Sequence, residues 1–173
     1  MTSIDKATLT RRELLARAGS ATALVAVGAG FIAAPDASWA MEVSNISEHQ
    51  MATLLQMARD IYPHDKVGDE YYAIAVKGYD SEDMKDMVAA GVTMLDEKAR
   101  AGGNADYLTT KWEANRVAIL REIEDEGFFQ TVRGGLVTGL YNQKAVWPIF
   151  GYEGESYSKG GYIDRGFDDI SWL

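Results

Sequence analysis

Cysteine is absent from this chain of 173 residues. Without cysteine the chain can form no disulfide, no C-x-x-C-H haem attachment, no cysteine-ligated iron–sulfur cluster and no thiolate zinc site. Any covalent haem that takes part in its function must therefore be carried by another chain. The fold itself must be held together by its hydrophobic core or by a partner.

Histidine is nearly as scarce, with two residues in the whole chain. His49 falls in the first turn of an expected helix beside Glu48, and we interpret it as a solvated polar residue. His64 follows Pro63 in a turn beside Asp65, where a pH-sensitive or metal-binding role is an alternative to a purely structural one. Neither histidine belongs to an H-E-x-x-H or E-x-x-H pattern, so a metal site within a helical bundle lacks its ligands.

Positive charge is also in short supply, with 17 basic against 26 acidic residues and a net charge of −9. Such a chain repels phosphate backbones and anionic lipid, which disfavours binding to nucleic acid or to a membrane surface. The acidic run around Glu122, Glu124, Asp125 and Glu126 is interpreted as a solvated helix face.

Sequence motifs for catalysis and cofactor binding are missing as well. The chain has no G-x-S-x-G elbow for a serine nucleophile and no Gly-rich turn after a strand that would cradle a phosphate. We therefore predict no catalytic, cofactor-binding or metal-binding residues in this chain. A cofactor-free enzyme that uses tyrosine and aspartate residues near the C-terminus is a further alternative, but no spacing in the sequence favours it.

What the chain does contain begins near its N-terminus. Arg11 and Arg12 precede a charge-free run of small and apolar residues from Ala18 to Ala34, and small residues at Ser38 and Ala40 suit a cleavage site. This arrangement resembles the twin-arginine (Tat) export leader of bacteria, which is an address read by a receptor and not part of the fold. The resemblance predicts export to the periplasm.

Residues 1–40 are therefore predicted to be a signal peptide, and the mature protein is predicted to start at Met41. A permanent membrane anchor is the alternative, but the apolar run is at the short edge of what can span a hydrocarbon core of roughly 30 Å. A buried core helix is a further alternative, and it is less favoured still because its three glycines would each cost about 1 kcal/mol relative to alanine in a helix interior. Because leaders of this type often serve chains that cross the membrane already folded, the simplest interpretation is that this subunit folds on a leaderless partner before export.

Helical periodicity dominates residues 41–141, and almost no alternating strand pattern interrupts it. Ser47 and Gln50 form a capping box for a first helix that ends near Tyr62, before Pro63. Further helices are expected over residues 69–77 and 128–141. Another is expected between a cap at Ser81 and a stop at Gly102. A cap at Thr109 or Thr110 is expected to begin one more helix, with Trp112 and Arg116 on its buried face. Together they predict an all-α domain, a small bundle of four to five helices.

The helical period disappears in the last 32 residues, 142–173, which are rich in glycine and aromatic side chains. A structureless segment of this length is uncommon in a compact domain and is usually functional. The segment either wraps back and buries its aromatic side chains as extra core, or lies on a partner subunit, because Tyr and Trp are favoured anchors of such contacts.

Both arrangements can hold at once, with one set of aromatic side chains inward and the other outward. The inward set is Trp147 and Phe150, and the outward set is Tyr162, Phe167 and Trp172. The predicted partner-contact residues are Trp147, Phe150, Tyr152, Tyr162, Phe167 and Trp172.

The same segment carries a family resemblance. Its motifs are Leu140-Tyr141-Asn142-Gln143-Lys144, Val146-Trp147-Pro148, Phe150-Gly151-Tyr152-Glu153-Gly154, Lys159-Gly160-Gly161-Tyr162, and Gly166-Phe167-Asp168-Asp169-Ile170 with Trp172. They resemble the C-terminal pattern of the gluconate 2-dehydrogenase subunit 3 family, and the end of the first helix, Ile61-Tyr62-Pro63, is similar as well. The resemblance covers about the whole mature chain and is strong in its last third.

Members of that family are small, often Tat-exported subunits that accompany an FAD-containing oxidoreductase of the glucose–methanol–choline type, commonly with a haem c subunit as electron acceptor. The resemblance implies a chaperone-like accessory subunit that supplies the export signal and supports the fold of a large partner carrying the FAD. It brings no catalytic residue, cofactor site or substrate to this chain. A stand-alone periplasmic ligand-binding protein, with an aromatic pocket built by the C-terminal segment, is the alternative.

Overall fold

The computed structural model describes residues 25–26, 31–33 and 41–165 of the chain. Five α-helices form most of this part: α2 (Glu48–Ile61), α3 (Asp69–Val76), α4 (Lys85–Ala101), α5 (Glu113–Arg121) and α6 (Gly127–Tyr141). Three short 3₁₀ helices follow α3 or α6: η1 (Lys77–Tyr79), η2 (Trp147–Phe150) and η3 (Tyr157–Lys159). The predicted all-α class is confirmed. We call residues 41–141 the helical body and residues 142–165 the arm.

Three very short strands lie at the N-terminal side of the described chain. They are β1 (Val25–Ala26), β2 (Phe31–Ala33) and β3 (Met41–Glu42), paired antiparallel in the order β1-β2-β3. Val25 lies opposite Ala33, Phe31 lies opposite Glu42, and β2 lies near α2. β1 and β2 fall within the segment predicted to be a signal peptide, whose Arg11 and Arg12 lie outside the described residues. Among the helices that the structure describes, none has the length and apolar character needed to cross a bilayer.

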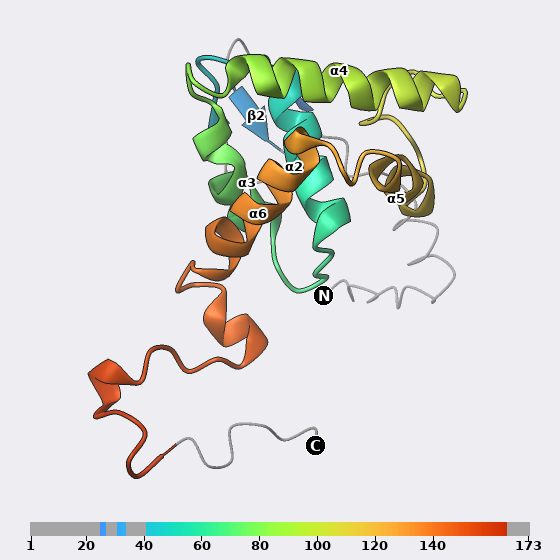
Figure 1. The fold of residues 1–173 in the computed structure, drawn as a ribbon. Helices are drawn as coiled ribbons and strands as arrows, with labels where there is room; N and C mark the ends of the chain where they lie inside the picture. The colour runs from blue at the N-terminus through green and yellow to red at the C-terminus, as the bar shows by residue number, and fades with distance from the viewer. Residues whose placement is uncertain (1–24, 27–30, 34–40, 166–173) are drawn as a thin grey trace, which may run out of the picture.

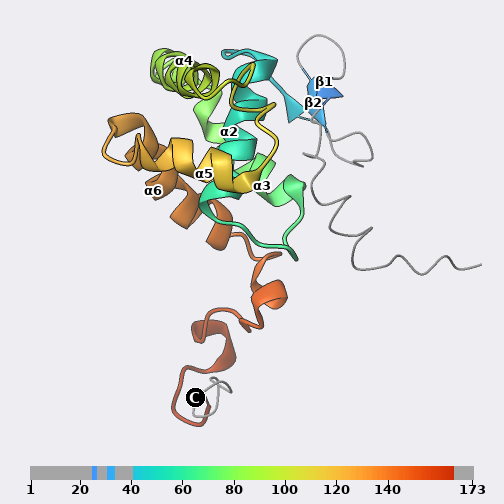
Figure 2. The same ribbon diagram turned by 90° about the vertical axis from the view of Figure 1, so that its right-hand side faces the viewer.

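Helix α2 is the centre of the fold and contacts each of the other four helices (Figures 1 and 2). Every residue from Met51 to Ala58 is buried, as expected for a helix enclosed on all sides. The predicted capping box is present: the Gln50 N–H donates to Ser47 Oγ at 3.2 Å, and the Ser47 N–H donates to Gln50 Oε1 at 2.7 Å. The helix ends before Pro63, as predicted, because the residue preceding a proline disfavours the helical conformation.

Two glycines allow the outer helices to pack closely around α2. A Cβ atom at Gly139 of α6 would lie 3.1 Å from the carbonyl oxygen of Ala75 in α3. A Cβ atom at Gly91 of α4 would overlap the ring of Phe128, the second residue of α6. Gly139 is therefore a point of close contact between α6 and α3, and Gly91 is one between α4 and α6.

The predicted start of α4 is wrong. The helix begins at Lys85, and residues 81–84 form a turn in which the carbonyl of Ser81 accepts the N–H groups of Met84 and Lys85. No side chain caps this helix, so Ser81 acts through its backbone. The predicted end is correct, since Gly102 follows the last helical residue and Gly103 has a positive φ of 84°.

The predicted cap and buried face of α5 also need correction. Thr110 does not cap the helix, because its hydroxyl donates to the carbonyl of Asp106 at 2.9 Å within the preceding turn. Thr109 bonds Asp106 in the same turn. Trp112 occupies the N-cap position and is 62% exposed, so it does not belong to the buried face. Arg116 does belong to it and is buried.

Candidate functional site

The arm leaves the helical body where α6 ends and extends away from the helices (Figures 1 and 2). Its first residues are anchored: Val146 is fully buried, and the indole N–H of Trp147 donates to the carbonyl of Tyr141 at 2.8 Å. The amide of Gln143 reaches the carbonyls of Tyr71 and Gly139. The base of the arm is thus fixed to α3 and α6.

Aromatic side chains cluster where the arm meets the body. Tyr141 Oη lies 2.6 Å from His64 Nε2, and the ring of Tyr62 packs edge-on against Tyr141 with the centroids 5.6 Å apart. The ring of Phe150 lies 4.9 Å from that of His64 and 5.9 Å from that of Tyr141, measured between centroids. We call these four residues the arm root. They join the loop after α2, the end of α6 and helix η2.

His64 is a packing residue of the arm root. Burial, the largest cause, and the nearby charge of Arg59 both lower the pKa of His64 from its usual value of 6.5. The ring is therefore neutral near pH 7 and can accept the Tyr141 hydroxyl hydrogen. Within the described ranges, no group of three or more His, Asp or Glu side chains is placed to hold a metal ion.

Beyond the arm root, the arm is held by its own residues. All hydrogen bonds and ion pairs that residues 152–165 make within the described chain join them to other arm residues. Glu153 pairs with Lys159 and Arg165, and Glu155 lies 2.7 Å from Lys144 Nζ. Ion pairs this exposed contribute little to stability. The arm is therefore an extension that the helices do not cover.

Large apolar side chains are exposed along the arm. The exposed fractions are 47% for Phe150, 48% for Tyr152, 93% for Tyr157, 54% for Tyr162 and 83% for Ile163. Single exposed apolar residues are ordinary, but a succession of them on one segment is typical of a binding surface.

The predicted partner-contact residues occupy different positions on this surface. Trp147 is half-buried against Tyr152, at 5.2 Å between ring centroids, and against Gly154. Phe150, expected to point inward, packs against His64 within the arm root but leaves nearly half of its surface exposed. Tyr162, expected to point outward, is exposed. Phe167 and Trp172 lie outside the described residues.

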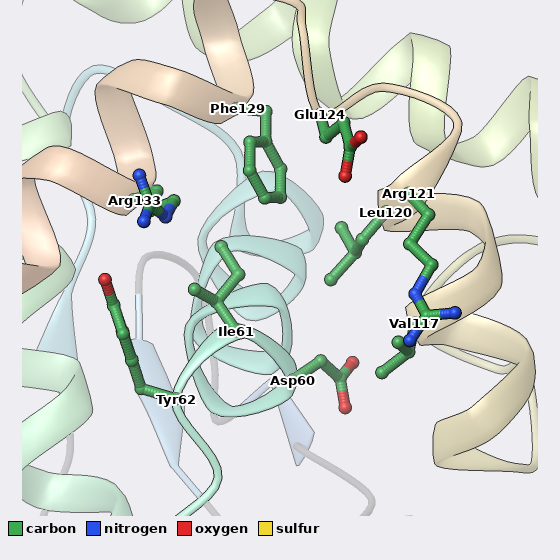
Figure 3. A pocket seen from close by; sticks show the side chains of 9 residues that line it. All are labelled: Asp60, Ile61, Tyr62, Val117, Leu120, Arg121, Glu124, Phe129 and Arg133. Atoms are coloured by element: carbon green, nitrogen blue, oxygen red, sulfur yellow. The ribbon is translucent and has the colours of Figure 1, made fainter.

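A second surface feature is a groove between α2, α5 and α6, with a volume of about 200 Å³. Its apolar floor consists of Ile61, Val117, Leu120 and Phe129, and Arg121 and Arg133 stand on opposite sides of it (Figure 3). The remaining lining residues are Asp60, Tyr62 and Glu124. The alternative of a pocket built by the C-terminal segment does not describe this groove, since all its lining residues belong to the helical body.

Beside the groove lies a buried polar cluster that sequence reasoning missed. Both carboxylate oxygens of Asp60 accept from Arg116, at 2.7 and 2.8 Å, and one also accepts the Tyr107 hydroxyl at 2.8 Å. Gln56 donates to the other oxygen, and Arg116 also donates to the carbonyl of Thr110 at 2.8 Å. Burial and the adjacent Asp60 charge hold the pKa of Tyr107 well above its usual value. Burial lowers the pKa of Arg116, but the Asp60 carboxylate outweighs it and raises the value overall.

This cluster is structural because its groups satisfy one another. It joins the end of α2 to α5 and to the loop that contains Tyr107 and Thr110. His49 is exposed, as expected of a solvated polar residue, and its Nε2 also lies 2.8 Å from Asp96 Oδ2, a contact that the sequence did not indicate. The other oxygen of Asp96 accepts the N–H of Tyr107. No spacing in the sequence signals these pairs, because their members lie far apart along the chain.

Comparison with known proteins gives no match: no family model, no curated protein and no solved structure is significantly similar to this chain.

Proposed function

We propose that this chain is the non-catalytic small subunit of an exported, FAD-dependent sugar or alcohol dehydrogenase complex. In this proposal the N-terminal segment with Arg11 and Arg12 directs the complex through the Tat pathway to the periplasm. The helical body and the arm stabilise a large subunit of the glucose–methanol–choline type, which carries the FAD and the substrate. A cytochrome c subunit is the proposed electron acceptor in a three-subunit complex.

The observation that carries the proposal is the arm with its exposed aromatic side chains. A segment whose hydrogen bonds are local and whose Tyr157 and Ile163 are almost fully exposed gains little stability from its own chain. Aromatic residues of this kind gain most when they are buried against another protein. The motifs that resemble the gluconate 2-dehydrogenase subunit 3 family lie in the same segment, and they give the class of partner.

The helical body supports the proposal by offering a rigid base for the arm. The arm root fixes the direction in which the arm leaves α6, so part of the ordering cost of binding is met before the partner arrives. A pre-formed attachment of this type suits a subunit that guides the folding of another chain.

Co-expression with a large oxidoreductase subunit of the glucose–methanol–choline type, sought in the reading frame adjacent to this one, tests the proposal. We expect the two chains to purify together with bound FAD and dye-reducing activity, whereas the large subunit alone gives little soluble, active protein. Substitution of Arg11 and Arg12 by lysine should leave the complex active in the cytoplasm and absent from the periplasm. The proposal fails if the large subunit folds, binds FAD and reaches the periplasm equally well without this chain.

The alternative of a stand-alone ligand-binding protein makes a different prediction. It requires the purified chain to gain thermal stability from a small molecule, because a ligand that binds only the folded state raises the melting temperature. The groove of about 200 Å³ lies in the helical body and is smaller than the roughly 300–1,000 Å³ usual for small-molecule sites, so it does not supply the aromatic pocket that this alternative requires. For this reason we favour the accessory subunit.

A further inference from the structure

The cationic side chains of the described chain fall into two groups. Most lie within 4.0 Å of a carboxylate, including Arg59, Arg116 and Lys144. The Lys and Arg residues of the described ranges that make no ion pair are Lys66, Lys111, Arg121 and Arg133. Two of these four line the groove between α2, α5 and α6, although the chain as a whole is acidic.

The charges in the groove do not cancel. Asp60 lines it, but the charge of Asp60 is balanced by the buried guanidinium of Arg116 at 2.7 Å. Of the carboxylates that line the groove, this leaves Glu124. Its single negative charge faces the two exposed guanidinium groups of Arg121 and Arg133. The groove is therefore a positively charged site on a protein of net charge −9.

Apolar side chains of the groove lie between its two guanidinium groups. Figure 3 shows Arg133 on one side and Arg121 on the other, with Ile61 and Leu120 between them. Guanidinium groups bind carboxylates through paired hydrogen bonds, and they are the preferred cations at protein interfaces. An apolar floor between two such groups fits a peptide that presents one apolar anchor flanked by acidic side chains.

The groove is also continuous with the arm root. Tyr62 lines the groove and packs against Tyr141 of the arm root at 5.6 Å between ring centroids. A partner that covered the arm root would thus reach the groove without crossing another part of the surface. The volume of about 200 Å³ is that of a site for one anchoring side chain and not for a cofactor.

We propose that this groove binds a segment of the accompanying catalytic subunit in which carboxylates flank an aromatic or aliphatic anchor. The inference rests on the proposed function and adds to it a second contact, separate from the arm. Arg121 and Arg133 supply the electrostatic attraction and the orientation, and the apolar floor receives the anchor.

A charge reversal with a matched control tests the inference. The double variant Arg121→Glu/Arg133→Glu and the control Lys66→Glu/Lys111→Glu change the net charge by the same amount, and all four side chains are exposed and unpaired. Each variant is co-expressed with the large subunit of the proposed complex, and the Kd of the purified complex is measured at low and high ionic strength. We expect the groove variant to bind at least about tenfold more weakly at low salt, with a smaller difference at high salt, and the control to stay within about twofold.

Glu124→Gln is a second variant, and its expected effect on binding is opposite to that of the charge reversal. It removes the unneutralised carboxylate of the groove, so we expect tighter binding at low salt. Far-UV circular dichroism and thermal melting of each isolated variant confirm that the fold is intact.

The outcomes are distinct. Equal weakening by the groove variant and the control, or no weakening by either, overturns the groove while leaving the accessory subunit in place. Failure of the wild-type chain to form any complex overturns the proposed function and the groove with it.

Discussion

Tyr107 in the helical body is fully buried, whereas Tyr157 in the arm is 93% exposed. The body buries its polar groups in pairs, as Asp60 and Arg116 show, while the arm pairs Lys144 with Glu155 in solvent. Ordering a residue costs about 1–2 kcal/mol, and only the body recovers this cost by burial. The body is therefore stabilised by its own buried groups, whereas the arm gains little stability from the rest of the described chain.

The largest effect is expected from a substitution that breaks the buried polar cluster of the body. Asp60→Ala leaves Arg116 buried without its counter-charge and Tyr107 without its acceptor. We expect the free energy of unfolding to fall by about 3–5 kcal/mol, measured by urea denaturation of the chain. Lys144→Ala, which breaks an exposed ion pair of the arm, is the control and should change it by less than about 0.5 kcal/mol. Equal losses in the two variants would contradict the division into body and arm.

A smaller effect is expected at the glycine where α4 meets α6. The added methyl group in Gly91→Ala overlaps the ring of Phe128, so we expect a loss of about 1–3 kcal/mol in unfolding free energy. Gly134→Ala in α6 is the matched control, because a Cβ atom there meets no atom within 4 Å. That variant should gain up to about 1 kcal/mol from its higher helix propensity. If both substitutions stabilised the chain, close packing between Gly91 and Phe128 would be contradicted.

The third prediction concerns acid stability and Asp80. Burial would raise the pKa of Asp80, but the N–H groups of Ser44, Asn45 and Ile46 together with Lys77 lower it from 3.8 to about 2. The unfolded chain therefore binds this proton more readily, and the stabilisation present above about pH 4 is lost as the pH falls to 2.

The measurement compares wild type with Asp80→Asn from pH 5 to pH 2. We expect the stability advantage of the wild type to shrink by about 1–2 kcal/mol over this range. Glu155→Gln in the arm is the control: the hydrogen bond from Lys144 lowers the pKa of Glu155 as well, but this pair is exposed, so its loss should change the pH profile much less than the loss of Asp80 does. If the unfolding free energies of wild type and Asp80→Asn changed in parallel with pH, Asp80 would not be the source of this acid sensitivity.

Local signals predicted the helices well. The capping box of Ser47, the stop at Pro63 and the glycines after α4 each act on the nearest turn of the backbone, so they can be recognised without knowledge of the fold. The start of α4 was wrong because Ser81 makes a turn through its carbonyl instead of a side-chain cap. Trp112 was misplaced because its helix begins one residue after it.

Long-range pairs could not be predicted in the same way. Asp60 and Arg116 lie 56 positions apart, and His64 and Tyr141 lie 77 apart. Their spacing carries no period, and charged or aromatic residues occur throughout the chain. The groove likewise combines residues of three helices, which the sequence does not bring together. That its arginines make no ion pair can be recognised only from the structure, where the partners of the other cations are known. The arm, in contrast, could be recognised from composition alone, because losing the helical period is a local property.

The smallest expected effect is the sharpest test of the comparison between body and arm. Tyr157→Ala and Tyr162→Ala remove exposed rings, so we expect the unfolding free energy of the isolated chain to change by less than about 0.5 kcal/mol. Binding to the large subunit should instead weaken, by about 1 kcal/mol or more for a ring that anchors the contact. Tyr72→Ala in the body is the reverse control: its buried ring should cost several kcal/mol of stability. If the arm variants also destabilised the isolated chain, the arm would be part of the core and the reason to assign it to a partner would disappear.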